Sequence, residues 1–185
     1  MESKNKVFIA TSLDGYIADK NGGIDWLHSV PNPEQNDMGY TDFISQIDAL
    51  VMGRTTFETV CGFEEWPYQK PVFVLSNSLS ELPIAYKGKA ELVKGDLKQI
   101  IQEINSKGYH QLYIDGGRTI QSFLKEDLID EMTITIIPYL LGGGTSLFSE
   151  LPNKLDFECS NTNLYLGKVA QNKFVRKRNL DEVKF

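Results

Sequence analysis

Short runs of apolar residues alternate with stretches of helical periodicity along most of the chain, a pattern typical of α/β proteins. Continuous apolar runs predict buried strands at 7–10, 49–52, 72–75, about 90–93 and 112–114. Apolar residues at helical spacing predict helices over 40–47, from about 55, over 97–104 and through 123–124. Because strands and helices alternate, we expect a mostly parallel central sheet with helices on both faces.

The last third of the chain has a different pattern. Residues 132–137 alternate threonine with apolar side chains, and 157–160 and 169–175 have the character of further strands. These segments predict antiparallel strands in the C-terminal part of the sheet. We therefore expect a single domain over residues 1–175, followed by a polar tail at 176–185.

The composition argues against several classes of protein. The net charge of −6 disfavours nonspecific nucleic-acid binding. The chain has no membrane-spanning apolar run and begins without the apolar core of a signal peptide, so we expect a cytoplasmic protein that does not bind membranes. Cys61 and Cys159, with His28 and His110, have neither disulfide nor metal-ligand spacing, and we expect no metal.

Residues 52–58, Met-Gly-Arg-Thr-Thr-Phe-Glu, join a predicted strand to a predicted helix. The first-turn N–H groups of such a helix are unpaired, and together with Arg54 they favour an anion at this position. The alternative is an ordinary helix start, with a threonine cap and Glu58 completing a capping box. Taken alone, this segment supports the two interpretations equally.

Two further strand ends carry small or polar residues. Ile-Asp-Gly-Gly-Arg-Thr at 114–119 lets the backbone approach a ligand closely, or else forms a tight turn. It lacks the Gly-x-Gly-x-x-Gly fingerprint, which disfavours a Rossmann fold. Leu-Ser-Asn at 75–77 ends another strand, and it too would serve as a plain turn. Because the carboxyl ends of parallel strands share one edge, all three ends are expected to face a common ligand.

Several blocks, in this order, resemble a known family. Residues 9–18, Ile-Ala-Thr-Ser-Leu-Asp-Gly-Tyr-Ile-Ala, resemble the N-terminal signature of dihydrofolate reductases and of the reductase domain of riboflavin-biosynthesis enzymes. Residues 52–58 resemble the second block of dihydrofolate reductase. Asp-Gly-Gly at 115–117, Leu-Ile-Asp-Glu-Met at 128–132 and Pro-Tyr-Leu-Leu-Gly-Gly-Gly at 138–144 resemble the riboflavin reductase domain in particular. The resemblance extends from Val7 to about Val175 and implies a dihydrofolate-reductase-like fold.

The resemblance implies NADPH bound across this sheet edge, with Arg54 near its 2′-phosphate and Ile24 beside the nicotinamide slot. It also implies a strained, often cis, peptide bond at Asp115–Gly116 or Gly116–Gly117. The implied cofactor contacts are Thr11, Ile17, Ala18, Gly53, Arg54, Thr55, Thr56, Leu75, Ser76, Asn77, Ile114, Gly116, Gly117, Arg118, Thr119 and Ile120. The expected substrate contacts are Trp26, Phe43 and Thr135.

The substrate side departs from both parent groups. Dihydrofolate reductases carry an acidic residue four positions before a phenylalanine, and if Phe43 matches that phenylalanine, Gly39 stands in the acidic position. Asp37 and Asp42 are nearby, but Asp42 belongs to the solvated face of the predicted helix. Riboflavin reductases carry basic residues after the second block, and residues 59–66 contain none. Neither parent substrate is therefore secured.

Hydride transfer needs orientation, exclusion of water and a proton route rather than a nucleophile. The candidates for the proton route are Asp14, the carboxylate nearest the nicotinamide slot, and Asp42, although Asp-Gly is also a routine turn pair. Trp26 would either close over the site as a lid or pack beneath a surface loop, and both interpretations stay open.

We expect an NADPH-dependent reductase of the riboflavin-biosynthesis type, similar to 5-amino-6-(5-phosphoribosylamino)uracil reductase and acting on a heterocyclic substrate. Two alternatives are a dihydrofolate reductase and an NADPH-binding protein without turnover. The strand at 133–137 and the C-terminal strands would suit pairing across a two-fold axis, which predicts a homodimer.

Overall fold

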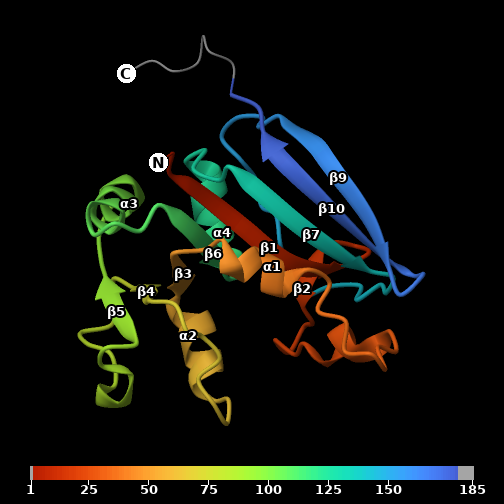
Figure 1. Ribbon diagram of the computed structural model, residues 1–185, viewed down its shortest axis with the longest axis horizontal. Coiled ribbons are helices and arrows are strands. Elements are labelled where there is room, and N and C mark those ends of the chain that lie inside the picture. Colours follow the sequence, from red (N-terminus) through yellow and green to blue (C-terminus); the bar gives the residue numbers. More distant parts are fainter. Residues whose placement is uncertain (1, 179–185) are drawn as a thin grey trace.

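Eight strands form the central sheet of the computed structural model, which describes residues 2–178 (Figure 1). In chain order they are β1 (Lys4–Ser12), β3 (Ala49–Gly53), β4 (Val72–Leu75), β5 (Ala90–Val93), β6 (Gln111–Asp115), β7 (Glu131–Ile137), β9 (Phe157–Tyr165) and β10 (Val169–Arg176). Across the sheet their order is β5-β4-β3-β6-β1-β7-β10-β9. A separate ribbon consists of β2 (Tyr16–Ala18) and β8 (Thr145–Ser146).

The sheet is parallel from β5 to β7, and β10 pairs antiparallel with both β7 and β9. A tight turn joins β9 to β10, in which Lys168 N donates to Tyr165 O at 3.0 Å. Such a turn can join only antiparallel neighbours, whereas parallel neighbours need a longer crossover. The predicted fold class is confirmed: a mostly parallel sheet with antiparallel C-terminal strands and a dihydrofolate-reductase-like topology.

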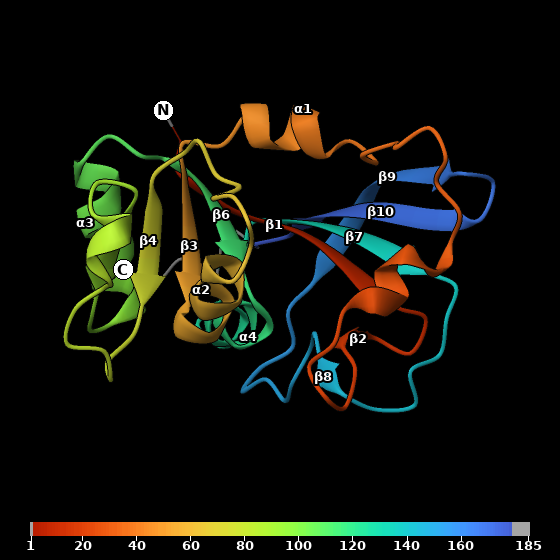
Figure 2. The same cartoon turned by 90° about the horizontal axis from the view of Figure 1, so that it is seen from below.

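Helices cover both faces of the sheet (Figure 2). α1 (Tyr40–Ser45) and α2 (Arg54–Cys61) lie on one face, and α3 (Leu97–Ser106) and α4 (Gly117–Lys125) lie on the other. Two short 3-10 helices, Asp25–Ser29 and Ile84–Tyr86, lie in the connections. The predicted helix over 40–47 ends at Ser45, and Ile47 is buried just beyond it.

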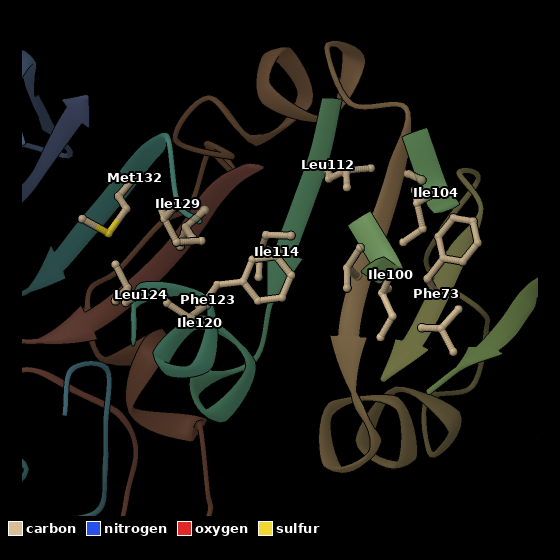
Figure 3. Close-up of a cluster of buried hydrophobic side chains, with 14 of the residues drawn as sticks. Phe73, Ile100, Ile104, Leu112, Ile114, Ile120, Phe123, Leu124, Ile129 and Met132 are labelled. Carbon is tan, nitrogen blue, oxygen red and sulfur yellow. The ribbon is translucent and has the colours of Figure 1, made fainter. Parts of the chain in front are cut away.

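Alternation along the strands sends neighbouring side chains into different cores. In β3, Val51 packs with the α3 and α4 side chains, whereas Leu50 and Met52 pack with the α1 and α2 side chains. Figure 3 shows the first of these cores, in which Ile114 and Phe123 are fully buried. Each such side chain stabilises the fold by about 1.5–3 kcal/mol. The sheet is therefore held from both faces, which keeps the strand ends in a constant arrangement.

The structure differs from two of the sequence expectations. No peptide bond among residues 2–178 is cis, so the expected cis bond at the glycine pair is wrong. Gly116 instead makes the turn with a φ of +91°, which glycine tolerates because it has no Cβ. β10 extends to Arg176, the first residue of the predicted tail, and the Arg176 Nε donates to Asp127 Oδ1 at 2.7 Å. Residues 179–185 lie outside the described part of the chain.

Within residues 2–178, none of the helices combines the length and the apolar character needed to cross a membrane.

Candidate functional site

A pocket of about 760 Å³ follows the carboxyl ends of the parallel strands. Its lining comes from the ends of β3, β4, β5 and β6, from β1 and β2, and from the first turns of α2 and α4. This is the edge at which open α/β sheets bind ligands, and the volume suits a small molecule or cofactor. The three strand ends singled out in the sequence therefore line one common pocket.

Both α2 and α4 start without a side-chain cap. Gly53 and Gly116 are the N-cap residues, and neither has a side chain to accept a hydrogen bond from the first turn. The alternative of a threonine cap with a capping box is contradicted, because the Glu58 carboxylate lies instead 3.8 Å from the Arg54 Nε. By contrast, Asp96 caps α3 by accepting from two backbone N–H groups. The uncapped first turns favour a bound anion.

The two helix starts also pack against each other through these glycines. A Cβ at Gly53 would lie 2.8 Å from Thr119 Oγ1, and a Cβ at Gly116 would overlap Thr56 Oγ1. Only glycine permits this approach, which brings two positive helix ends into one pocket. Arg54 and Arg118 are solvent-exposed and add a cation to each first turn. A chain with a net charge of −6 thus has a local site for phosphates.

At one end of the pocket, Ser76 and Asn77 tie the strands together. Ser76 N donates to Val93 O at 3.2 Å, and Asn77 Oδ1 accepts from Gly95 N at 3.2 Å. The Ser76 hydroxyl accepts from Leu79 N at 3.1 Å. These residues line the pocket and also hold its rim in place between β4 and β5.

The opposite end of the pocket is mostly apolar. Ile9 and Ala10 of β1 line it, together with Ile17 and Ala18 of β2 and Ile24 from the loop that follows. We call this region the apolar slot. A flat, weakly polar ring would fit between such walls, because they offer apolar surface without competing hydrogen-bond groups.

Asp115, which the sequence interpretation left without a role, lines the pocket at the end of β6. Its Oδ1 accepts from Gly116 N at 2.8 Å. The Tyr68 hydroxyl acts on the carboxyl as a hydrogen-bond donor. Tyr113 also lies beside the carboxyl, but its hydroxyl donates to Phe8 O at 2.9 Å, and Tyr40 lies near both tyrosines. Burial raises the pKa of Asp115 above the ordinary value and outweighs these hydrogen bonds, which lower it. The residue can therefore keep its proton to higher pH than an exposed aspartate.

A carboxyl with a raised pKa in a ligand pocket is a candidate general acid. The signal in the sequence was the position of Asp115, an acidic residue directly after a buried strand and before a glycine pair. Tyr68, which also lines the pocket, comes from an irregular segment with no periodic pattern, and nothing local marked it. The Asp115 carboxyl in turn raises the pKa of Tyr68, where burial has the largest effect.

Three of the expected cofactor contacts do not line this pocket. Ile114 and Ile120 have 0% of their surface exposed and belong to the core beneath it. Thr11 lines a different cavity of about 460 Å³, which lies among apolar side chains of β7 and β10. Strand alternation directs Ala10 and Thr11 to opposite faces of the sheet, and on the face of Thr11 it is Ile9 that reaches the pocket, whereas Thr11 lies in the other cavity. The remaining expected contacts all line the pocket.

None of the three expected substrate contacts lines the pocket. Trp26 is buried against Ile137 and Val169, and its Nε1 has no hydrogen-bond partner. Its packing favours the interpretation that Trp26 supports the loop from beneath. Phe43 of α1 stacks on Phe8 with ring centroids 4.9 Å apart. Thr135 is buried, and its hydroxyl accepts from Gln171 Nε2 at 2.9 Å.

The two catalytic candidates lie outside the pocket lining. Asp42 is exposed on α1. Asp14 accepts hydrogen bonds from the Ser12 hydroxyl and from the backbone N–H groups of Leu141 and Gly142, and these bonds lower its pKa. An ionised, fully bonded carboxylate is a poor proton donor. Asp115 is therefore the better candidate for the proton route.

The position that matches the acidic residue of dihydrofolate reductases is occupied in this chain by Gly39. Gly39 precedes α1 with a φ of +86°, and a Cβ there would lie 3.4 Å from the Tyr165 hydroxyl. Asp37 accepts from Gly39 N and Thr41 N, both at 2.9 Å, so its carboxylate is occupied with the start of the helix. Thr41 lowers the pKa of Asp37 through side-chain and backbone hydrogen bonds. No aspartate is thus presented to the pocket from α1.

Comparison with protein families matches residues 6–170 to the RibD C-terminal domain. Two Bacillus subtilis (strain 168) proteins of uncharacterized function are related over almost their whole length. YwjB is 34% identical over 180 residues, covering 95% of this chain and 99% of YwjB. YyaP is 27% identical over 177 residues, covering 88% of this chain and 89% of YyaP.

Several solved structures resemble this chain. A Shewanella sp. PV-4 protein, provisionally described as a riboflavin biosynthesis protein, is 56% identical with a TM-score of 0.92, covering 95% of this chain and 99% of that one. The Thermotoga maritima deaminase and 5-amino-6-(5-phosphoribosylamino)uracil reductase is 14% identical with a TM-score of 0.73, and the match spans 95% of this chain and 57% of that protein. Dihydrofolate reductase from Enterococcus faecalis, solved with NADP(H), is 17% identical with a TM-score of 0.65 over 95% of this chain and 97% of that one. The protein therefore belongs to the RibD C-terminal domain family and has a dihydrofolate-reductase-like fold.

Proposed function

We propose that the protein is an NADPH-dependent reductase of the riboflavin-biosynthesis type, which transfers a hydride to a heterocyclic substrate. The observation that carries this proposal is the pocket itself. Two uncapped helix starts and two arginines face its middle, and an apolar slot with Asp115 forms one end. Membership of the RibD C-terminal domain family supports an oxidoreductase with this arrangement.

The residues of the pocket fit NADPH. Arg54 and the first turns of α2 and α4 would hold the phosphates, Ser76 and Asn77 would contact the adenosine half, and the apolar slot would hold the nicotinamide. When bound, NADPH supplies the hydride. The glycines at the two helix starts let the backbone donors approach phosphate oxygens closely.

The chain's own residues would orient the substrate and provide the proton. Reduction of a C=N or C=O bond adds a hydride at carbon and a proton at nitrogen or oxygen. Asp115 is the pocket carboxyl whose pKa is raised by burial, so we assign the transfer of the proton to its carboxyl group. Tyr68 would hold the substrate beside Asp115, and the apolar slot would exclude water from the reacting atoms.

The arginines of the pocket lie at the helix starts, so the substrate half carries no cation of its own among the lining residues. Lys70 does not supply a cation to the substrate half. Its charge interacts with Asp48, which lies at the amino end of β3, opposite the pocket. Lys94 directly follows β5 and belongs to the adenosine end. A phosphoribosyl substrate would therefore have to share the arginines at the helix starts. This is why we name the substrate only as a heterocycle.

The test is NADPH oxidation, followed by its absorbance, on adding 5-amino-6-(5-phosphoribosylamino)uracil and then unphosphorylated pyrimidines and pterins. Consumption of NADPH with any of these supports the reductase. Tight binding of NADPH without consumption across the whole set would favour the alternative of a binding protein without turnover. Absence of NADPH binding would contradict the proposal. The homodimer stays a prediction, which sedimentation would test.

Arg54→Ala should weaken NADPH binding by about 1.5–3 kcal/mol, the range for hydrogen bonds to charged groups. Arg54 is solvent-exposed, so we expect the lower end at physiological salt. The affinity for NADH, which lacks the 2′-phosphate, should fall much less. Isothermal titration of both cofactors measures this, with Lys98→Ala on α3, outside the pocket, as the matched control. Equal affinity of the wild type for NADPH and NADH would contradict the assignment.

Dihydrofolate should be reduced slowly or not at all, because no aspartate of α1 reaches the pocket to hold the pterin. A buried polar group left without its charged partner costs several kcal/mol in binding. The measurement is NADPH consumption with purified protein and dihydrofolate. Rapid turnover that is lost on Asp37→Asn or Asp42→Asn would show that one of these carboxylates is the pterin ligand.

A further inference from the structure

The ribbon of β2 and β8 forms part of the apolar slot but lies outside the central sheet (Figure 2). β2 has three residues and β8 has two, and they pair through Tyr16 with Ser146 and Ala18 with Thr145. A two-stranded ribbon this short is not stable without support from its surroundings. Since Ile17 and Ala18 line the pocket, whatever holds β2 also sets the shape of the slot.

The Asp14 carboxylate connects the end of β1 to the segment that follows β7. It accepts from the Ser12 hydroxyl at 2.6 Å, from Leu141 N at 3.1 Å and from Gly142 N at 2.8 Å. The Ser12 hydroxyl oxygen in turn accepts from Tyr16 N at 3.0 Å, at the start of β2. One side chain thus joins two segments that are 127 residues apart in sequence.

Backbone hydrogen bonds continue this connection on either side. Leu13 N donates to Tyr139 O at 2.8 Å, and Leu147 N donates to Gly15 O at 3.0 Å. From α4, the Gln121 amide donates to Ser146 O at 2.8 Å. The β2 ribbon is therefore held at both ends, while Asp14 fixes the turn between them.

The glycine-rich turn at 142–144 packs directly on the backbone of β2. Gly144 has a φ of +137°, and a Cβ there would overlap the Ala18 carbonyl oxygen. On the opposite side, a Cβ at Gly117 of α4 would lie 2.5 Å from Ile17 Cδ1. β2 is thus enclosed between the turn and the start of α4. A displacement of the turn leaves Ile17 and Ala18 without their support.

We infer that Asp14 is a positioning residue, which fixes the turn at 138–144 against β2 and so sets the width of the apolar slot. The sequence blocks at 9–18 and 138–144 then act as one unit, although each was noted separately. Asp14 acts through Ile17 and Ala18 and does not touch the reacting atoms. The inference rests on the proposed function, because the slot is where the nicotinamide half of NADPH is proposed to bind.

Asp14→Asn is the direct test. Asparagine has the same shape, but its NH₂ would face a backbone N–H in place of an acceptor oxygen. Calorimetry compares NADPH with adenosine 2′,5′-bisphosphate, which carries the adenosine half and lacks the nicotinamide. We expect the affinity for NADPH to fall roughly fivefold to tenfold, the effect of losing a hydrogen bond, with the bisphosphate unchanged. An equal loss of affinity for both ligands, or no loss of affinity for either, would overturn the inference.

Gly144→Ala and Gly142→Ala form a matched pair within the same turn. Both glycines have positive φ, at +137° and +66°, but a Cβ at Gly142 meets nothing within 4 Å. Gly144→Ala should therefore weaken NADPH binding more than Asp14→Asn does, and Gly142→Ala should leave it near the wild-type value. Circular dichroism of each variant checks that the fold is retained. Equal effects of the two alanines would show that backbone strain, rather than contact with β2, governs the result.

A measurement without ligand separates this inference from the proposed function. Amide hydrogen exchange, followed by mass spectrometry, should be faster in Asp14→Asn at 16–18 and 145–147, with the rest of the sheet unchanged. Unchanged exchange at these residues overturns the inference even if NADPH binds. Faster exchange in a protein that binds neither ligand supports the positioning role and contradicts the proposed function instead.

Discussion

Asp115→Asn should reduce turnover of the substrate by a factor of about 10²–10⁴, the usual contribution of a general acid, while NADPH binding is retained. Asparagine keeps the size of the side chain and its contact with Gly116 N, but its amide cannot give a proton to the substrate. Asp115 directly precedes Gly116, the N-cap of α4, and because the asparagine oxygen can still accept from Gly116 N, the helix start should keep its geometry for the phosphates. The measurement is single-turnover NADPH oxidation beside a cofactor titration.

The same variant should be more stable than the wild type at neutral pH. Burial raises the pKa of Asp115 in the folded state above its unfolded value, so the wild type loses stability as pH rises through the interval between the two. Asparagine does not titrate and avoids this loss. The gain in melting temperature should be present at neutral pH and vanish below the unfolded pKa of about 3.9. A variant less stable than the wild type at neutral pH would show that Asp115 is ionised and favourably bonded in the fold.

The pH dependence of turnover is a third test of the role of Asp115. If the protonated carboxyl is the acid, kcat falls as pH rises through its raised pKa. Tyr68→Phe removes a hydrogen bond that lowers this pKa, and the fall should therefore move to higher pH. Tyr86→Phe is the matched control in the same aromatic cluster, because its hydroxyl donates to Cys61 O, away from the pocket. A fall in activity toward low pH would exclude Asp115 as the acid.

Gly117→Val should abolish measurable NADPH binding and leave a folded protein. Gly117 is buried at the start of α4, and the added side chain would displace Ile17, whose Cδ1 would lie 2.5 Å from the new Cβ. The branched carbons would also press on Thr145 of β8, whose Cγ2 is 3.5 Å from the same position. Cofactor titration measures the loss, and near-ultraviolet circular dichroism checks the packing of the remainder.

A second substitution distinguishes two explanations for this loss. If valine acts by displacing Ile17, then Ile17→Ala in the same protein should restore part of the affinity, because the shortened side chain makes room. If valine occupies the place of the pyrophosphate, Ile17→Ala gives no recovery. Gly117→Ala should have an intermediate effect, since a single methyl group meets only the far end of a flexible side chain. Normal NADPH binding by Gly117→Val would show that the glycine pair has only a structural role.

The local pattern along the chain was sufficient to predict the strands and helices of the sheet and the three strand ends that line the pocket. Apolar runs, helical spacing and glycines at the strand ends report on neighbouring residues, so these features are readable without knowing the fold. The direction in which each side chain points was harder to predict from the sequence. Thr11 and Ile114 stand in the expected segments but point away from the pocket, because register and alternation decide which face a strand residue occupies. Ile120 belongs to the buried face of α4, which the turn of the helix directs into the core.

The pairing of residues distant in sequence was decided by the tertiary structure alone. Asp115 acquires its raised pKa from burial beside Tyr68 and Tyr113, and Asp14 acquires its two backbone partners, Leu141 N and Gly142 N, from the segment after β7. Asp14 does not differ from an ordinary turn residue when only its neighbours are considered, and the position of Asp115 before the glycine pair does not reveal its burial. The charge state of a carboxyl depends on the solvent it loses and on the donors it gains, and both are fixed when the strands and loops come together.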